Sequence, residues 1–402
     1  DYNSTTNYYE FYSLSAIGPN LIMHTGDTIS FEVSATTSLL FPLLSAGTAT
    51  EIISGDTVIT IRHTLWESGQ TGFMSVQLQH GNNYTYQNFG LTAGKDGYNN
   101  SFYSTIIGGS ANTINTLSNY GIIGAGRLNN LSGFGSSILS GLRNKTYGDY
   151  SSIINGVNNN VFNTFNFVGN GMANKAYTTF SSILNGNSNT AKTEYSTIIN
   201  GSWNLSVGKF NLVGNGYLNK SLGRYATVVN GLKNSAFTST EYFTTILNGK
   251  YNLVNSRHSN ILNGSLNTIS TYSNYGSINN GSGNTINSGY FNTVINGIDH
   301  LINNARRSSV DNGLNNTIQT SAYSSIKNGE RNRIFHSTGS TILNGQGNSA
   351  QTNDFIFIGN GINNLSEGEH SSILNGIQNK NFGTSSSILA GDNNVISGNV
   401  SS

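Results

Sequence analysis

One short phrase repeats nineteen times between Gly109 and Gly391, and it limits the possible folds of this chain more than any other feature. Its typical form is Ser-Ser-Ile-Leu-Asn-Gly-x-x-Asn, as in residues 181–189, and the glycines that anchor it follow one another at steps of 15 to 18 residues. A period this short, with β-branched residues and Gly/Asn turns, accommodates one coil of a β-solenoid and is too short for a helical repeat. Residues 98–402 are therefore predicted to form a shaft of about 19 stacked coils.

Two apolar positions in each coil predict its core. The residue three before every anchoring glycine is Ile or Val, from Ile106 to Ile388. A second apolar residue recurs, less strictly, five after the glycine, as in Ile114 and Ile269. Alternation along a short strand turns every second side chain inward, so this pattern indicates a thin coil with two strands and a stacked core.

Asn and Gly dominate the turns of the repeat. Asn follows the anchoring glycine by three residues in every coil except the one with His300, and in most coils it also directly precedes the glycine. Both residues tolerate left-handed backbone, and Asn side chains stacked in register can satisfy one another and the turn backbone, so we interpret them as structural. Examples are Asn155, Gly156, Asn159, Asn185, Gly186, Asn189, Asn375, Gly376 and Asn379. An aromatic residue recurs six before the glycine and predicts a stacked aromatic ladder.

The outer face of the phrase strand is apolar where a solvent-facing strand would be polar. In most coils a Leu, Ile or Val stands two before the glycine, and a small polar residue stands four before it. In four coils the pair is inverted, as at Phe167 and Gly169, so large-small becomes small-large. Such volume compensation is expected only in a packed contact, which predicts burial against another chain. The predicted contact residues are Leu139, Ile154, Phe167, Leu184, Ile199, Leu212, Val229, Leu247, Leu262, Ile295, Leu343, Phe357 and Leu374.

Closed cyclic self-association would cover this apolar face, which is an aggregation hazard if left open. The face is interrupted at Asn279, Asp311 and Lys327. Asp311 and Lys327 lie one coil apart and are expected to pair or to set the register between chains, and an ion held at an axis by three copies is the alternative.

Phrases such as Tyr103-Ser-Thr-Ile-Ile-Gly-Gly-Ser-Ala-Asn-Thr-Ile resemble the YadA-like head repeats of trimeric autotransporter adhesins, and still more the similar repeats of phage tail-fibre proteins. The resemblance covers about residues 101–400. It implies an all-β, left-handed parallel β-roll or β-solenoid that packs side by side as a homotrimer. It also implies a role in attachment to a surface.

The leading functional hypothesis is therefore a virion tail-fibre or attachment protein, located on the virion surface. It would bind a host-cell surface receptor of glycan or protein nature and could contact other virion proteins. The alternative is an extracellular adhesin of the trimeric autotransporter kind on a bacterial cell surface. This sequence shows no coiled-coil stalk or barrel anchor after the repeats, which favours the fibre.

Composition excludes several other classes. The chain has no Cys, so a thiol nucleophile and a Cys-based zinc site are ruled out, and we expect no metal and no cofactor. Charged residues are 9% of the chain and the net charge is +1, which gives little electrostatic basis for binding nucleic acid. No long apolar segment is present, which predicts no membrane insertion.

Residues 1–97 lack the repeat and are predicted to be a separate β-sandwich-like domain. Strands are expected at residues 10–17, 28–35, 57–65 and 73–80. Both prolines of the chain, Pro19 and Pro42, lie in this region.

Catalytic signals are weak throughout, and we expect no enzyme. The best candidates are Asp354 and Glu369, each seven before an anchoring glycine and therefore one strand apart. Two carboxylates near 5 Å are typical of a retaining glycosidase, so a polysaccharide depolymerase tailspike is the third hypothesis. A charged outer edge of the solenoid explains the same residues more simply.

Overall fold

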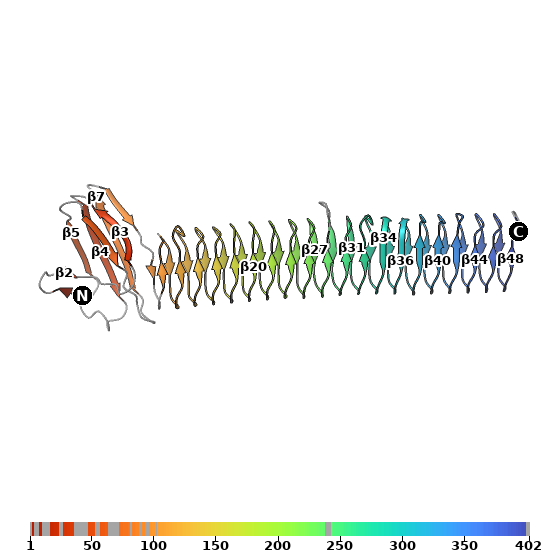
Figure 1. The fold of residues 1–402 in the computed structure, drawn as a ribbon, viewed down its shortest axis with the longest axis horizontal. Coiled ribbons are helices and arrows are strands. Elements are labelled where there is room, and N and C mark those ends of the chain that lie inside the picture. The colour runs from red at the N-terminus through yellow and green to blue at the C-terminus, as the bar shows by residue number, and fades with distance from the viewer. Residues whose placement is uncertain are drawn as a thin grey trace. The chain divides into compact units, whose positions relative to one another are not determined.

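The computed structural model describes residues 97–398, apart from residue 102 and residues 238–242, and within residues 1–92 it describes nine strands alone. All regular structure in this described part is β, and no helix occurs in it. The chain divides into two compact units, residues 1–190 and residues 191–402. Both contain turns of a parallel β-solenoid of about 20 turns (Figure 1).

The first strands pair antiparallel, as the sequence predicts for this region. The strand β3 (Ile17–Met23) pairs with β6 (Thr57–Arg62), and a four-stranded sheet has the order β5 (Gly47–Ile52), β4 (Asp27–Ala35), β7 (Gly72–His80), β8 (Asn83–Gln87). The hairpin of β1 (Tyr2–Asn3) and β2 (Tyr8–Tyr9) precedes them. Three of the four expected strands correspond to β4, β6 and β7. Residues 10–16 of the fourth lie outside the described residues.

Each coil of the solenoid contributes one short strand to each of two parallel sheets. In the first unit, sheet one contains β9 (Leu91–Thr92), β11 (Thr105–Ile106), β13 (Ile122–Ile123), β15 (Ser137–Ile138), β17 (Ser152–Ile153), β19 (Phe167–Val168) and β21 (Ser182–Ile183). Sheet two contains β10 (Tyr98–Asn99), β12 (Thr113–Ile114), β14 (Asn130–Leu131), β16 (Lys145–Thr146), β18 (Asn160–Val161) and β20 (Lys175–Ala176), and β22 (Thr190–Ala191) falls at the unit boundary.

The second unit continues the same alternation. Its part of sheet one contains β23 (Thr197–Ile198), β25 (Leu212–Val213), β27 (Ala226–Val228), β29 (Thr244–Ile246), β31 (Ser259–Ile261), β33 (Ser277–Ile278), β35 (Thr293–Val294), β37 (Ser309–Val310), β39 (Ser325–Ile326), β41 (Thr341–Ile342), β43 (Phe357–Ile358), β45 (Ser372–Ile373) and β47 (Ser387–Ile388). Its part of sheet two contains β24 (Leu205–Ser206), β26 (Lys220–Ser221), β28 (Ser235–Ala236), β30 (Leu253–Val254), β32 (Thr268–Ile269), β34 (Thr285–Tyr290), β36 (Leu301–Arg306), β38 (Thr317–Gln319), β40 (Arg333–Phe335), β42 (Ser349–Gln351), β44 (Leu365–Ser366), β46 (Lys380–Asn381) and β48 (Val395–Ile396).

The core lies between the two sheets and has the composition that the repeat predicts. The Ile or Val three before the anchoring glycine is fully buried from Ile106 to Ile373. In the same coils the residue five after the glycine is also fully buried, even where that residue is Ala, Ser or Thr. Each fully buried Ile contributes about 1.5–3 kcal/mol through removal of its side chain from water. The interior is thus narrow, with two small or medium side chains per coil at its centre.

A buried Asn ladder runs beside this core and confirms the structural interpretation of the Asn that follows the glycine by three. The backbone N–H of Asn159 donates to Oδ1 of Asn144 at 3.0 Å, and Nδ2 of Asn159 donates to the carbonyl of Gly171 in the next coil at 2.9 Å and to that of Asn155 at 3.3 Å. The same bonds recur along both units. Because these groups are buried, leaving any of them unpaired would cost about 1–3 kcal/mol.

The left-handed backbone positions differ in part from those expected. The anchoring glycines have positive φ, 114° at Gly156, as predicted. Most of the other left-handed residues are either the residue two after the glycine, such as Asn158, or the residue six before it, such as Phe180. A bulky residue in this region costs about 1–2 kcal/mol, so the aromatic ladder must offset local strain.

Stacking of the rings supplies that compensation. Ring centroids in the predicted ladder lie 5.1 Å apart for Phe165 and Phe180 and 4.6 Å apart for Tyr275 and Phe291, with nearly parallel planes. His258 stands six before its anchoring glycine and stacks on Tyr275 at 4.9 Å, so this His takes the place of an aromatic residue in the ladder.

Candidate functional site

The most unusual surface of the solenoid is a column of exposed aliphatic side chains along sheet one. We call the residues two before the anchoring glycines the apolar column. Each follows a fully buried Ile or Val, so alternation points its side chain outward. As predicted, these side chains face away from the core, and they are 36% to 49% exposed at Leu139, Ile154, Leu184, Ile199, Val229, Leu247, Leu262, Ile295, Leu343 and Leu374.

In each inverted pair a glycine occupies the apolar column. Volume compensation is one reason for that glycine, and the structure shows a second. Phe167, Leu212 and Phe357 are half-buried beside Gly169, Gly214 and Gly359. A Cβ built on Gly169 would lie 3.4 Å from Phe167 Cε1, and only 2.4 Å from the carbonyl oxygen of Leu184 in the next coil. The backbone of the neighbouring coil therefore requires glycine here, in addition to the large residue beside it.

The polar interruption of the column forms the ion pair that the sequence predicts. Lys327 Nζ lies 3.0 Å from Asp311 Oδ2. The Lys327 side chain is 47% exposed and that of Asp311 17%. A partly exposed pair contributes about 1 kcal/mol or less to stability, which fits a role in register better than one in stability.

Of the two candidate catalytic carboxylates, Asp354 contacts the preceding coil and Glu369 lies beside the next residue of its own coil. Asp354 Oδ1 accepts a hydrogen bond from the backbone N–H of Thr338 at 2.6 Å, and Glu369 Oε1 lies 3.7 Å from Nε2 of His370. The ring of His370 stacks on Phe355 at 4.9 Å. Within the described residues, no group of three or more His, Asp or Glu side chains is placed to hold a metal ion. The hydrogen bond to Thr338 gives Asp354 a structural role at the edge of the solenoid.

His300 occupies the Asn ladder and imitates Asn there. Its backbone N–H donates to Asn284 Oδ1 at 3.0 Å, and its Nδ1 accepts a hydrogen bond from the Asn316 backbone N–H at 3.1 Å. Acceptance at Nδ1 requires the neutral ring with its proton on Nε2. Burial lowers the pKa of His300 more than the nearby Asn296 carbonyl and Asp299 carboxylate raise it.

The stability of the shaft should therefore fall in acid because of His300. Its pKa in the folded chain lies below the ordinary value of 6.5, so the unfolded chain binds the proton first. The stabilisation is complete above pH 6.5 and is lost as pH falls through the folded pKa. We expect the thermal midpoint to drop more between pH 7.5 and pH 5 in the unmodified chain than in His300→Asn, each pKa unit being worth about 1.4 kcal/mol. Equal pH dependence in both proteins would contradict this assignment.

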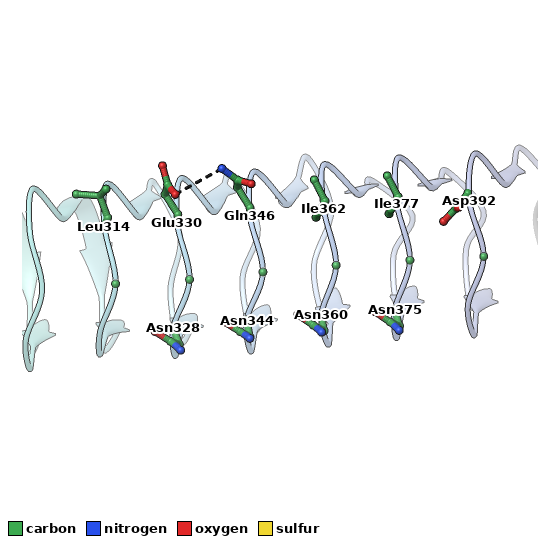
Figure 2. Close-up of a pocket in the computed structure, with 16 residues that line it drawn as sticks. Leu314, Asn328, Glu330, Asn344, Gln346, Asn360, Ile362, Asn375, Ile377 and Asp392 are labelled. Carbon is green, nitrogen blue, oxygen red and sulfur yellow. Dashed lines mark hydrogen bonds between the residues drawn. The ribbon is translucent and has the colours of Figure 1, made fainter.

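A groove beside the apolar column was not predicted. It runs past Gly313, Gly329, Gly345, Gly361, Gly376 and Gly391. In Figure 2, Asn328, Asn344, Asn360 and Asn375 line one side of this groove, and Leu314, Glu330, Gln346, Ile362, Ile377 and Asp392 line the other. The spacing of residues along a strand does not predict this groove, because its two walls come from residues on either side of the turn at each anchoring glycine.

Comparison with models of known protein families finds no match, and comparison with curated proteins finds no matching relative. In the described part of the chain, no helix is long and apolar enough to cross a membrane. The geometry of the solenoid surface is therefore the basis on which a function is proposed.

Proposed function

We propose that this chain is a virion attachment protein, a tail fibre in which three copies pack their solenoids side by side into a rigid shaft. The shaft holds a part that binds a host-surface receptor away from the particle. The observation that carries this proposal is the apolar column, which leaves an aliphatic side chain partly exposed in most coils. Monomeric soluble proteins rarely expose apolar surface in such an extended row.

The architecture of one coil supports the same conclusion. Its centre is narrow and most of its hydrogen bonds join adjacent coils, so stability accumulates along the axis. Association through the apolar column would add buried area at every level and would thicken a slender shaft. Three chains in a left-handed β-roll, as the resemblance implies, form a closed ring that leaves no apolar column exposed.

Multi-angle light scattering on the purified chain tests the proposal. We expect a mass three times the 43.0 kDa of one chain, and a mass that stays constant on dilution through the micromolar range. Binding of the trimer to intact host cells, in competition with whole particles, then tests the attachment role. A stable monomer would remove the physical basis of the fibre hypothesis.

A further inference from the structure

We propose that the groove beside the anchoring glycines receives the apolar column of a second copy of this chain, so that the shaft is closed by one repeated contact between two different faces. The inference rests on the proposed trimer and specifies its contact. The two faces are the apolar column and the rim column, by which we mean the residues one after each anchoring glycine.

The floor of the groove is kept empty by the fold itself. A Cβ built on Gly345 would lie 2.1 Å from the carbonyl oxygen of Gly361 and 2.4 Å from Nδ2 of Asn348, and similar contacts occur at Gly361 and Gly376. These positions are therefore restricted to glycine, and the row carries no side chain of its own. Gly345 also has φ of 110°, which disfavours any other residue. The result is one gap per coil, between the Asn side chains and the rim column (Figure 2).

The apolar column supplies an aliphatic side chain in most coils, at the same spacing. Within a coil, only the residue before the glycine and the glycine itself separate it from the rim column. The rim column is also apolar in many coils, and Ile298, Ile362 and Ile377 are 41% to 50% exposed. The solenoid thus presents two columns on the two sides of one edge, and in coils such as that of Gly376 both positions are exposed and apolar. Three such edges arranged around an axis can place each apolar column against the groove of the next copy.

Rotation about an axis parallel to the solenoid keeps every coil level with the same coil of its neighbour, so contacts join coils of equal number. The sizes of the side chains agree with this rule. Where the apolar column has glycine, at positions 124, 169, 214 and 359, the rim residue of the same coil is always large. These rim residues are Arg127, Met172, Tyr217 and Ile362. The four serines of the rim column, Ser110, Ser202, Ser265 and Ser282, all lie in other coils.

The charged residues of the two columns also agree with contacts between coils of equal number. The coil of Gly329 has Lys327 in the apolar column and Glu330 in the rim column, so level packing brings Lys327 next to Glu330 of a second copy. Within its own chain Lys327 already pairs with Asp311, and Gln346 Nε2 donates to Glu330 Oε2 at 3.4 Å. The contact between copies would place the cation between two carboxylates, which favours this register over a shift by one coil.

Disulfide trapping tests the contact, because the chain has no cysteine of its own. Two chains, Leu374→Cys and Ile377→Cys, are produced together with different affinity tags, so that only a bond between copies can join them. We expect more than half of the mixed trimers to contain a disulfide between the two variants on a non-reducing gel. Ile295→Cys with Ile298→Cys is a second pair, in case the first disturbs folding. Leu374→Cys with Lys380→Cys, whose lysine lies in β46 of the other sheet, is the control and should not cross-link.

Three other results of the trapping experiment and the mass measurement would overturn the inference. Cross-linking of Leu374→Cys to itself would show that apolar columns meet one another, which overturns the inference and leaves the trimer intact. A trimeric mass with neither pair cross-linked would also overturn it. A monomeric mass of the unmodified chain would overturn the proposed function together with the inference.

Discussion

Gly345→Ala is expected to destabilise the second unit by about 3 kcal/mol or more. The new Cβ would lie 2.1 Å from the Gly361 carbonyl oxygen, and backbone in the next coil cannot move aside without breaking its own ladder. The φ of 110° adds strain that alanine cannot relieve. Because coils depend on their neighbours, the damage should be greatest in the coils around residue 345. Hydrogen exchange resolved by segment, together with the thermal midpoint, measures both effects.

Gly108→Ala is the matched control for this substitution. A Cβ on Gly108 meets no atom within 4 Å, and its backbone is not left-handed. We expect its thermal midpoint to stay within about 1 °C of the unmodified chain, since a change below about 0.2 kcal/mol moves the midpoint little. If the two variants were equally stable, the close packing of glycine against the next coil would be wrong.

Leu262→Asp is expected to convert most of the trimer into monomer at micromolar concentration. Leu262 is 36% exposed in the single chain, and it belongs to the apolar column. Symmetry repeats the substitution in three chains, and each buried carboxylate costs several kcal/mol unless it is paired. The fold of the coil should survive, because the side chain points away from the core and Ile261 stays buried. Light scattering gives the mass, and circular dichroism gives the retained strand content.

Leu253→Asp is a control of the same chemistry on the opposite sheet. Leu253 lies in β30 and is 37% exposed, so it matches Leu262 in residue type and exposure. We expect this variant to remain trimeric. Dissociation by both substitutions would indicate a general effect of added charge, and dissociation by Leu253→Asp alone would place the contact on sheet two.

Much of the solenoid could be predicted from single positions of the repeat. Ile183 and Asn189 occur at fixed distances from Gly186, and a buried strand residue and a buried turn amide are the only environments that suit such a pattern in every coil. The pairing of Asp311 with Lys327 could be predicted for the same reason, since their equal position in successive coils places them one strand apart. The left-handed conformation of Phe180 could not be, because aromatic residues rarely adopt it and only ring stacking between coils makes it favourable.

The sequence by itself determined the period, the core positions, the outward direction of the apolar column and the stacking of Asn and aromatic side chains. These properties follow from distances along the chain, which a regular repeat converts directly into positions in space. The tertiary structure alone decided that the anchoring glycines form the floor of a groove, that Gly169 is held against the Leu184 carbonyl, and that Asp354 is bound to the Thr338 backbone. Those contacts depend on how closely one coil approaches the next, and the spacing of residues in the sequence contains no measure of that distance.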